Sequence, residues 1–314
     1  MRDSEMREAG PPSEFDNTMI TSYLSCPRKK YWWWRGLDFQ ITPSYFIWGR
    51  AWGATLNSWH GSVGEEKIVR IANALNAGKE IFMEQDGMEF TEGSNDTEKN
   101  LENTFIQYTE VYGEEEPWEQ MGSELGFNLP IKGTEIFYAG SIDAYIHWKK
   151  YGLFNREDKS TGGYITQGYL ESWKHSSQVS GYYWGLRQIL EEEPFGVLMN
   201  IVSKRPRKEP DLRFQRSLEQ RSEWQIEKFI SETVKIADMI RGEWDTWLWP
   251  KWGERDPYEC AGGPGKSRCL YRRLCLMEME PWELEESYDF SQEFQWRKGK
   301  WTPWERKGSD KEES

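Results

Sequence analysis

Long apolar segments are absent from this sequence. Across its 314 residues, no uncharged apolar run approaches the roughly 20 residues that a membrane-spanning helix needs. The first ten residues are charged and lack the apolar core of a secretory signal. From these absences we expect a soluble, cytoplasmic protein without a membrane partner.

Cysteine is scarce, with four residues in the whole chain. Without a secretory signal, these are better explained as metal or cluster ligands than as disulfides. Cys260, Cys269 and Cys275 lie close together in a segment rich in glycine, whereas Cys26 is distant in sequence and alone fits an ordinary buried cysteine. Together the four make a complete thiolate set, which suits an iron–sulfur cluster or Zn²⁺.

Acidic residues outnumber basic ones, and a net charge of −13 weighs against a nucleic-acid partner unless the acidity is local. It is local, because residues 84–119 hold twelve acids and one lysine, a net of −11. Basic clusters elsewhere can bind phosphates, although solvated surface residues explain each cluster equally well. The clusters are Arg28, Lys29, Lys30 and Arg35; Lys204, Arg205, Arg207, Lys208, Arg213 and Arg216; and Lys266, Arg268, Arg272 and Arg273. We take Lys204, Arg205, Arg207 and Lys208 as candidate DNA contacts.

The stretch from Gly140 to Ser160 predicts a β-hairpin, with turn residues at 150–152. Asp143 lies on its first strand. Glu157 and Lys159 lie on the second strand and share one face, because side chains on a strand alternate sides. Two carboxylates and an ammonium at one sheet edge suit Mg²⁺- or Mn²⁺-dependent phosphodiester cleavage.

Two features of the second strand bear on this site. Asp158 lies between the two site residues and should point to the opposite face, away from any metal. Asn155 and Arg156 are polar where an apolar run would be expected, so we expect this strand to be less buried than its neighbours.

The rest of the chain predicts alternating helices and strands. Helices are expected at two short segments around Pro27 and at Phe46–His60, Lys67–Met83, Leu101–Tyr112, Glu171–Leu190 and Leu218–Trp249, and strands at Met121–Pro130, Gly133–Ala139 and Phe195–Val202. Residues 1–15 are expected to be disordered, residues 84–119 to form an acidic, solvated insertion, and residues 281–314 to form a polar, tryptophan-rich tail. Residues 16–280 would then form a single domain.

Several of these motifs occur in the order of one known family. Gly-x-Ile-Asp143 is followed by Glu157-x-Lys159-Ser, then by Gln178-xxx-Tyr182 on one helix face, and Cys26-Pro-Arg ends an early helix led by Ser/Thr. Over most of positions 17–276 the chain resembles the RecB-like branch of the PD-(D/E)xK nuclease superfamily, whose relatives include phage exonucleases and CRISPR adaptation nucleases. The resemblance implies an α/β fold in which helices flank a mixed central sheet, the restriction-endonuclease-like core, with a cysteine-clamped C-terminal region.

The resemblance also implies roles for individual residues. Asp143 and Glu157 would bind Mg²⁺ or Mn²⁺, Lys159 would orient the water and stabilise developing charge, and Gln178 and Tyr182 would support the centre. Two further residues are second-tier metal candidates. Glu124 lies where relatives often carry an additional acid. The family's Gly-x-Ala-x-His motif has Gly53 in place of its histidine, and His60, outside that register, fits a structural role better than metal contact.

The four cysteines resemble those of the iron–sulfur nucleases of this branch. Cys26 would join Cys260, Cys269 and Cys275 around a [4Fe–4S] cluster. Zn²⁺ is the alternative metal for the four thiolates, because the spacing between these cysteines is longer than the usual CxxC spacing. The implied function is metal-dependent DNA cleavage, by exonuclease action on single-stranded or free-ended DNA, in recombination, repair or replication with other proteins of those processes. The alternative is a catalytically inactive iron–sulfur or zinc protein that binds DNA or serves as a scaffold.

Overall fold

The computed structural model describes residues 3–39, 42–84, 94–251, 257–262, 268–277, 294–297 and 302–305. The chain forms two compact units. The first unit comprises residues 1–41, 130–139 and 228–301, and the second comprises residues 42–129, 140–227 and 302–314. The single domain expected over residues 16–280 is therefore divided between two units. None of the described helices has the length and apolar composition needed to cross a membrane.

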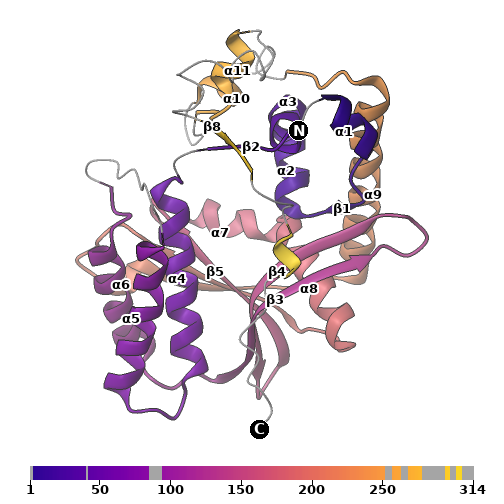
Figure 1. The fold of residues 1–314 in the computed structure, drawn as a ribbon. Coiled ribbons are helices and arrows are strands. Elements are labelled where there is room, and N and C mark those ends of the chain that lie inside the picture. The colour runs from indigo at the N-terminus through magenta and orange to yellow at the C-terminus, as the bar shows by residue number, and fades with distance from the viewer. Residues whose placement is uncertain are drawn as a thin grey trace. The chain divides into compact units, whose positions relative to one another are not determined.

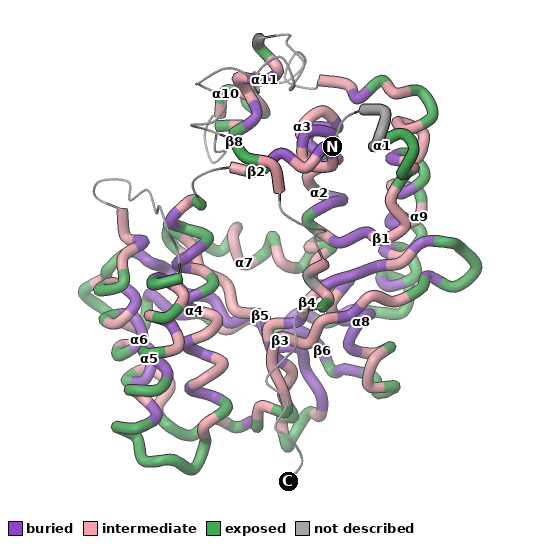
Figure 2. Tube along the Cα trace, viewed as in Figure 1, coloured by how far each residue is buried: buried purple, intermediate pink, exposed green. Residues whose placement is uncertain are grey.

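The second unit is organised around a mixed sheet (Figure 1). The longer strands of this sheet are β3 (Trp118–Pro130), β4 (Phe137–Trp148), β5 (Gly152–Thr161), β6 (Gly196–Ser203) and β7 (Phe214–Glu219), of which residues 130 and 137–139 belong to the first unit. β3 and β5 both pair with β4, β6 pairs in parallel with β5, and β7 is antiparallel to β6. All eight residues of β6 are buried, as expected of a strand covered on both faces (Figure 2). The α/β class with a mixed central sheet is confirmed.

The predicted hairpin is formed by β4 and β5. Its turn closes through a hydrogen bond from the Tyr151 N–H to the Trp148 carbonyl at 2.9 Å. Gly152 leaves the turn with φ +89°, a conformation that a residue with a side chain adopts only under strain. Ala144 pairs with Arg156 in the resulting antiparallel register.

Helices cover both faces of this sheet. On one side lie α4 (Ser44–Gly61), α5 (Lys67–Met83) and α6 (Glu98–Tyr112), and on the other lies α8 (Ser177–Leu190) (Figure 1). Large aromatic side chains of α4 form the centre of the apolar core. At Gly78 of α5, an added Cβ would lie 2.2 Å from Thr55 Oγ1, so this glycine permits the close approach of α4 and α5.

Helix α6 corrects the expectation of a solvated acidic insertion. Its N-cap Thr97 accepts a hydrogen bond from the Asn100 N–H at 3.1 Å, and its apolar face buries Leu101, Phe105 and Tyr108 in the core. The acids of this helix, Glu98, Glu102 and Glu110, lie at exposed or partly exposed positions. Residues 85–93 lie outside the described residues.

Two predicted helices have different bounds in the structure. The helix expected at Glu171–Leu190 is divided into α7 (Gln167–Lys174) and α8, and the helix expected at Leu218–Trp249 is α9 (Glu223–Thr246). Reciprocal hydrogen bonds between Ser222 and Gln225 form a capping box that fixes the start of α9. The separate strand expected at Gly133–Ala139 is absent from this described segment, and β4 begins at Phe137.

The first unit is mainly helical. It contains α1 (Asp3–Ala9), β1 (Glu14–Phe15), α2 (Asn17–Ser25), α3 (Pro27–Trp34), β2 (Leu37–Phe39), most of α9, α10 (Pro257–Ala261), α11 (Arg272–Met277) and β8 (Phe294–Trp296). Asp16 caps α2 by accepting from the Met19 N–H at 2.6 Å, and Pro27 opens α3, which confirms the two short helices. β1 pairs in parallel with the first residues of β4, and β2 pairs with β8.

Residues 3–15 do not follow the expectation of disorder. They form α1 and β1, because Met6 is buried in an aromatic cluster and Trp244 Nε1 donates to its carbonyl at 3.4 Å. The cluster also contains Tyr31, Trp32 and Trp249, so packing accounts for much of the tryptophan in this unit. Of the expected tail, only residues 294–297 and 302–305 are described.

Candidate active site

The β4–β5 hairpin brings Asp143 and Glu157 together. Because Ala144 pairs with Arg156, the same antiparallel register sets Asp143 opposite Glu157, and directly opposite residues point to the same face. Glu157 is buried, and Asp143 is partly buried. The Asp158 N–H donates to Oδ2 of Asp143 at 2.9 Å, which fixes that carboxylate against β5.

Lys159, Gln178 and Tyr182 complete this group. Lys159 Nζ donates to Oε1 of Glu157 and forms an ion pair with it. Gln178 Nε2 contacts the same Oε1 at 3.3 Å and the hydroxyl oxygen of Tyr182 at 3.1 Å. Gln178 and Tyr182 are one turn apart on α8, so their shared helix face meets the strand as the sequence predicted. All of the residues predicted as catalytic therefore gather at one place.

The electrostatics of this group follow from burial and like charge. Burial, and next the charge of Asp143, raises the pKa of Glu157 to about 8. Burial also raises the pKa of Asp143, although the positive charge of Lys159 opposes the rise. For Lys159, burial alone would lower the pKa, but the carboxylates of Glu157 and Asp143 outweigh it and the net direction is upward. Lys159 is therefore a cation, suited to stabilising charge rather than to acting as a base.

One atom tests whether a metal ion fits here. Oε2 of Glu157 is buried and has no hydrogen-bond partner among the described residues. A buried oxygen without a partner is costly, and a divalent cation beside it would satisfy it. Mg²⁺ commonly takes one or two carboxylates and completes its shell with waters and substrate phosphate, so Asp143 and Glu157 fit this ion. Within the described residues, no three Cys, His, Asp or Glu side chains form a complete protein metal site.

The other face of β5 carries a buried polar network, which corrects the expected exposure of this strand. Arg156 is fully buried, and it donates to Gln120 Oε1 at 2.8 Å, to Asn57 Oδ1 at 2.7 Å and to Asp158 Oδ2 at 3.0 Å. Asn200 Nδ2 donates to the other Asp158 oxygen at 2.8 Å. Asp158 thus points away from Glu157, as alternation predicted, and the strand is buried because its polar groups find partners.

His60 and Glu124 make contacts with groups other than the carboxylate pair. His60 is buried, its Nε2 is 3.1 Å from the Tyr108 hydroxyl, and burial followed by the charge of Arg156 lowers its pKa well below the usual value. Since Arg156 occupies the β5 face opposite Glu157, the structure does not support His60 as a metal ligand. Glu124 Oε1 accepts from Asn57 Nδ2 at 3.4 Å and so lies against α4.

The predicted DNA contacts fall into two groups. Lys204 is buried and forms an ion pair with Asp96, so it is not available to a phosphate, which corrects the expectation. Arg205 and Lys208 are exposed and Arg207 is partly buried. No sequence pattern assigns a role to Tyr164, yet the guanidinium carbon of Arg207 lies 3.8 Å from its ring centroid.

The four cysteines lie in the first unit. The Cys269 N–H donates to the Cys260 carbonyl at 3.1 Å, and Trp32 Nε1 donates to Cys275 Sγ at 3.5 Å. Burial raises the pKa of Cys269 to about 11, with smaller contributions from Cys275 and Cys260, and Cys26 contributes in the same way to the raised pKa of Cys275. The thiols are therefore electrostatic neighbours, and four thiols suit a cluster or Zn²⁺ chemically. The described residues do not, however, bring three of them into a ligand arrangement.

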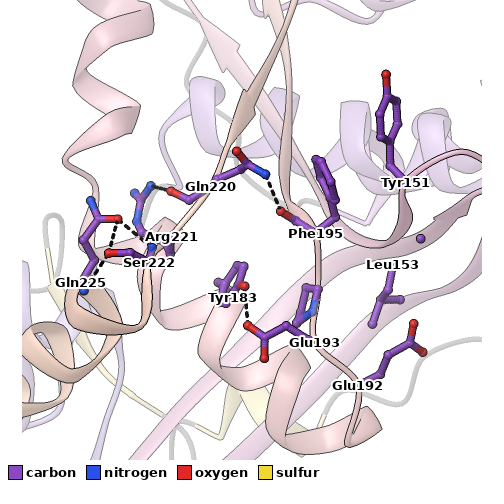
Figure 3. A pocket seen from close by; sticks show the side chains of 12 residues that line it. Tyr151, Leu153, Tyr183, Glu192, Glu193, Phe195, Gln220, Arg221, Ser222 and Gln225 are labelled. Carbon is purple, nitrogen blue, oxygen red and sulfur yellow. Dashed lines mark hydrogen bonds between the residues drawn. The ribbon is translucent and has the colours of Figure 1, made fainter.

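A hollow of about 670 Å³ lies elsewhere in the second unit. Tyr151, Leu153, Glu192, Glu193 and Phe195 are among the residues that line it (Figure 3). The Tyr183 hydroxyl donates to Glu193 Oε1 at 2.7 Å within it. It contains none of the predicted site residues, and it lies where β5 and β6 begin, whereas Lys159 lies toward the end of β5.

Comparisons with known proteins give limited likenesses. No protein-family model and no curated protein matches the chain. The chain is similar to the crystal structure of "Putative exonuclease" from Eubacterium rectale, with 11% identity and a TM-score of 0.42 over 77% of this chain and 86% of that chain. It is also similar to the crystal structure of SSO0001, with 11% identity and a TM-score of 0.27 over 69% and 86% of the two chains. Because both TM-scores are below 0.5, neither likeness carries an argument, and the function has to be argued from the site itself.

Proposed function

We propose that the chain is a metal-dependent nuclease whose centre is formed by Asp143, Glu157 and Lys159. One observation carries the proposal. Two carboxylates occupy opposite positions on one hairpin, and the buried Oε2 of Glu157 has no hydrogen-bond partner among the described residues. Among the described residues, Lys159 is the only cation that forms an ion pair with either carboxylate. A second positive charge, such as a divalent metal ion, would balance the second carboxylate.

The residues of the site divide the chemical work. A divalent ion bound by Asp143 and Glu157 would supply Lewis-acid activation of the attacking water and of the phosphate. Lys159 carries its proton and would stabilise negative charge that develops on the phosphate. Gln178 restrains Glu157 through Oε1 and leaves Oε2 open, while Tyr182 accepts from Gln178 and sets its orientation.

We further propose DNA as the substrate, single-stranded or with free ends, cleaved by exonuclease action in recombination, repair or replication. The order of the hairpin, Gln-xxx-Tyr and cysteine motifs supports this finer proposal, as do the exposed cations Arg205 and Lys208 near the end of the same sheet. Other proteins of those processes would be partners.

For the cysteines of the first unit we propose a [4Fe–4S] cluster, with Zn²⁺ as the alternative. The supporting contacts are the hydrogen bond from the Cys269 N–H to the Cys260 carbonyl and the bond to Cys275 Sγ from Trp32 of α3, whose N-cap is Cys26. Brown protein with visible absorbance from thiolate-to-iron charge transfer is expected. Colourless protein with one zinc ion per chain would replace the cluster with zinc.

The nuclease proposal is tested by digestion of end-labelled DNA with Mn²⁺, using wild type, Asp143→Asn and Lys159→Ala. We expect each variant to be slower by roughly a hundredfold or more, because each removes a ligand or a charge used in the transition state. Lys150→Ala, at the opposite end of the hairpin, is the matched control and should cleave like wild type.

Equal cleavage by all four proteins would indicate a contaminating nuclease. No cleavage by any of them, with DNA binding retained, would support the alternative of an inactive DNA-binding or scaffold protein. Linear, circular, single-stranded and duplex substrates in the same assay separate exonuclease from endonuclease action.

A further inference from the structure

Two arginines from the loop after β6 lie over one tyrosine from the loop after β5. The guanidinium carbon of Arg207 is 3.8 Å from the Tyr164 ring centroid, and that of Arg205 is 5.1 Å from it. β5 and β6 are parallel, and Thr161 pairs with Ser203 at their ends, so both loops leave the same edge of the sheet. Ligands commonly bind at the carboxyl ends of such strands. Lys159 is two residues before the end of β5.

Hydrogen bonds hold the two loops together. The Lys204 N–H donates to the Thr161 carbonyl at 2.9 Å, and Ser203 Oγ donates to the Gly163 carbonyl at 2.7 Å. Arg205 Nε donates to the Gly162 carbonyl at 3.1 Å. Tyr164 is nevertheless 50% exposed. The ring is therefore presented to solvent from a fixed backbone.

Among the described residues, no acidic side chain forms an ion pair with the arginines beside this ring. Among the residues that the structure describes, no carboxylate lies within 4.0 Å of the charged groups of Arg205, Arg207 or Lys208, and Nε of Arg207 is shielded without a hydrogen-bond partner. By contrast, Arg216 of the same basic segment pairs with Glu116. A phosphate could therefore bind to Arg205, Arg207 and Lys208, whereas Arg216 is already paired with a carboxylate.

We infer that Tyr164, Arg205 and Arg207 form a subsite for one nucleotide of a single-stranded nucleic acid. The exposed part of the Tyr164 ring would stack on a base, and the guanidinium groups would bind the adjoining phosphates. Bases of a duplex are already stacked on each other and paired, so they cannot use this ring. The inference rests on the proposed function, because the bound strand would lead toward Asp143, Glu157 and Lys159, and it names the substrate form that this centre accepts.

Helix α7 follows the loop that carries Tyr164 and contacts Lys159 through Trp173. It begins just after Tyr164 and contains no buried residue, as its pink and green trace shows (Figure 2). Tyr169 and Trp173 of this helix have ring centroids 5.8 Å apart, and Lys159 Nζ lies 5.7 Å from the Trp173 ring. Trp173, which contacts Tyr169, thus lies beside Lys159, and both rings are of the kind that stacks on bases along a strand-binding surface.

The test measures binding of fluorescein-labelled oligonucleotides by anisotropy, in an Asp143→Asn background so that the probe is not cleaved. The probes are oligothymidine, an abasic strand of the same length and charge, and a duplex. The abasic strand isolates stacking from phosphate contacts. The variants are Tyr164→Ala, Tyr164→Phe and Arg205→Ala/Arg207→Ala. The matched control is Lys150→Ala/Tyr151→Ala, which removes a similar pair, with Lys150 Nζ 4.9 Å from the Tyr151 ring (Figure 3 shows Tyr151 at the hollow).

We expect oligothymidine to bind about tenfold more tightly than the abasic strand, and Tyr164→Ala to abolish this difference while Tyr164→Phe keeps it. The double arginine variant should bind both the oligothymidine and the abasic strand more weakly. The slope of log K against log salt concentration should become shallower by about 0.7 for each phosphate contact that is lost. The control should bind like its parent.

The inference is overturned if the parent protein does not prefer oligothymidine to the abasic strand, if Tyr164→Ala leaves that preference intact, or if duplex binds as tightly as single strand. Failure of the proposed function is distinguishable. If the Asp143→Asn protein shows the expected binding pattern but wild type never cleaves DNA with Mn²⁺, the subsite is retained and the nuclease assignment is lost.

Discussion

Lys159 and Glu157 form an ion pair on β5 that uses only one oxygen of the carboxylate. Oε1 accepts from Lys159 and contacts Gln178, whereas Oε2 is buried without a hydrogen-bond partner in the described part of the chain. The oxygen that is left open is on the carboxylate that faces Asp143 across the hairpin. This asymmetry is the basis of the metal site proposed for this protein. The open oxygen of Glu157 could take either a proton or a metal ion, so we expect stability to depend on both pH and metal.

The first prediction concerns the stability of the metal-free protein against pH. Burial, then Asp143, raises the folded-state pKa of Glu157 from 4.5 to about 8. Since the folded state retains this proton longer than the unfolded state, stability is greatest below about pH 4.5 for this group and falls as pH rises toward 8. The charged groups that influence this pKa are Asp143, Lys159 and, from the opposite face of β5, Asp158.

At pH 8 without metal, Glu157→Gln should therefore have a higher free energy of unfolding in urea than wild type, by on the order of a few kcal/mol at most. The free energies of unfolding of the two proteins should converge near pH 5. Added Mn²⁺ should stabilise wild type at pH 8 and leave Glu157→Gln unchanged. A variant less stable than wild type at both pH values would show that burial of this carboxylate carries no cost.

The second prediction concerns His60. Its pKa is well below 6.5, first because it is buried and then because Arg156, Arg216 and Arg70 are close. The unfolded state binds a proton near pH 6.5 and the folded state does not, so this group removes stability as pH falls below 6.5. His60→Gln should show a shallower loss of stability between pH 7 and 5 in urea unfolding and should keep Mn²⁺-dependent cleavage within about twofold. Loss of cleavage in a folded variant would restore His60 as a candidate ligand.

The third prediction concerns the buried network behind the site. Arg156→Met leaves Asp158 as a buried charge without its arginine and should cost about 3–5 kcal/mol of unfolding free energy. Arg187→Met removes an ion pair to the exposed Glu223 and should cost less than about 1 kcal/mol. Urea unfolding measures both. Similar losses in the two variants would mean that the Arg156 network contributes no more than a surface pair.

The fourth prediction concerns the cysteines. Replacing Cys26, Cys260, Cys269 or Cys275 singly by Ser should lower bound iron or zinc per chain by at least about half, because thiolates hold these groups in sets of four. Trp32→Phe removes the N–H that donates to Cys275 but no ligand, so it should keep its metal content. Metal analysis of purified protein gives the answer. Full metal content in every serine variant would exclude the cysteines as ligands.

The sequence predicted the parts of the site that depend on local rules. Alternation along a strand placed Glu157 and Lys159 together and Asp158 opposite, and a four-residue helical spacing placed Gln178 with Tyr182. What it missed depends on distant partners. The donors of Arg156 meet Gln120, 36 residues away, and Asn57, 99 residues away, so the polar strand is buried rather than exposed.

Lys204 was wrongly grouped with the DNA contacts for the same reason. Its partner Asp96 lies 108 residues away, and composition alone cannot distinguish a buried lysine from a surface one. Tyr164 was overlooked because a single tyrosine after a Gly-Gly pair has no pattern of its own. The arginines that identify it arrive from another strand through the parallel pairing of β5 and β6.

The central claim is that Asp143 and Glu157 share one divalent ion. Mn²⁺ binding followed by electron paramagnetic resonance tests it most directly, using wild type, Asp143→Asn, Glu157→Gln and, as the control, Glu193→Gln from the remote hollow. We predict saturable binding to wild type and to the control, and at least tenfold weaker binding to each of the other two variants. Undiminished Mn²⁺ binding by folded Asp143→Asn and Glu157→Gln would contradict the account.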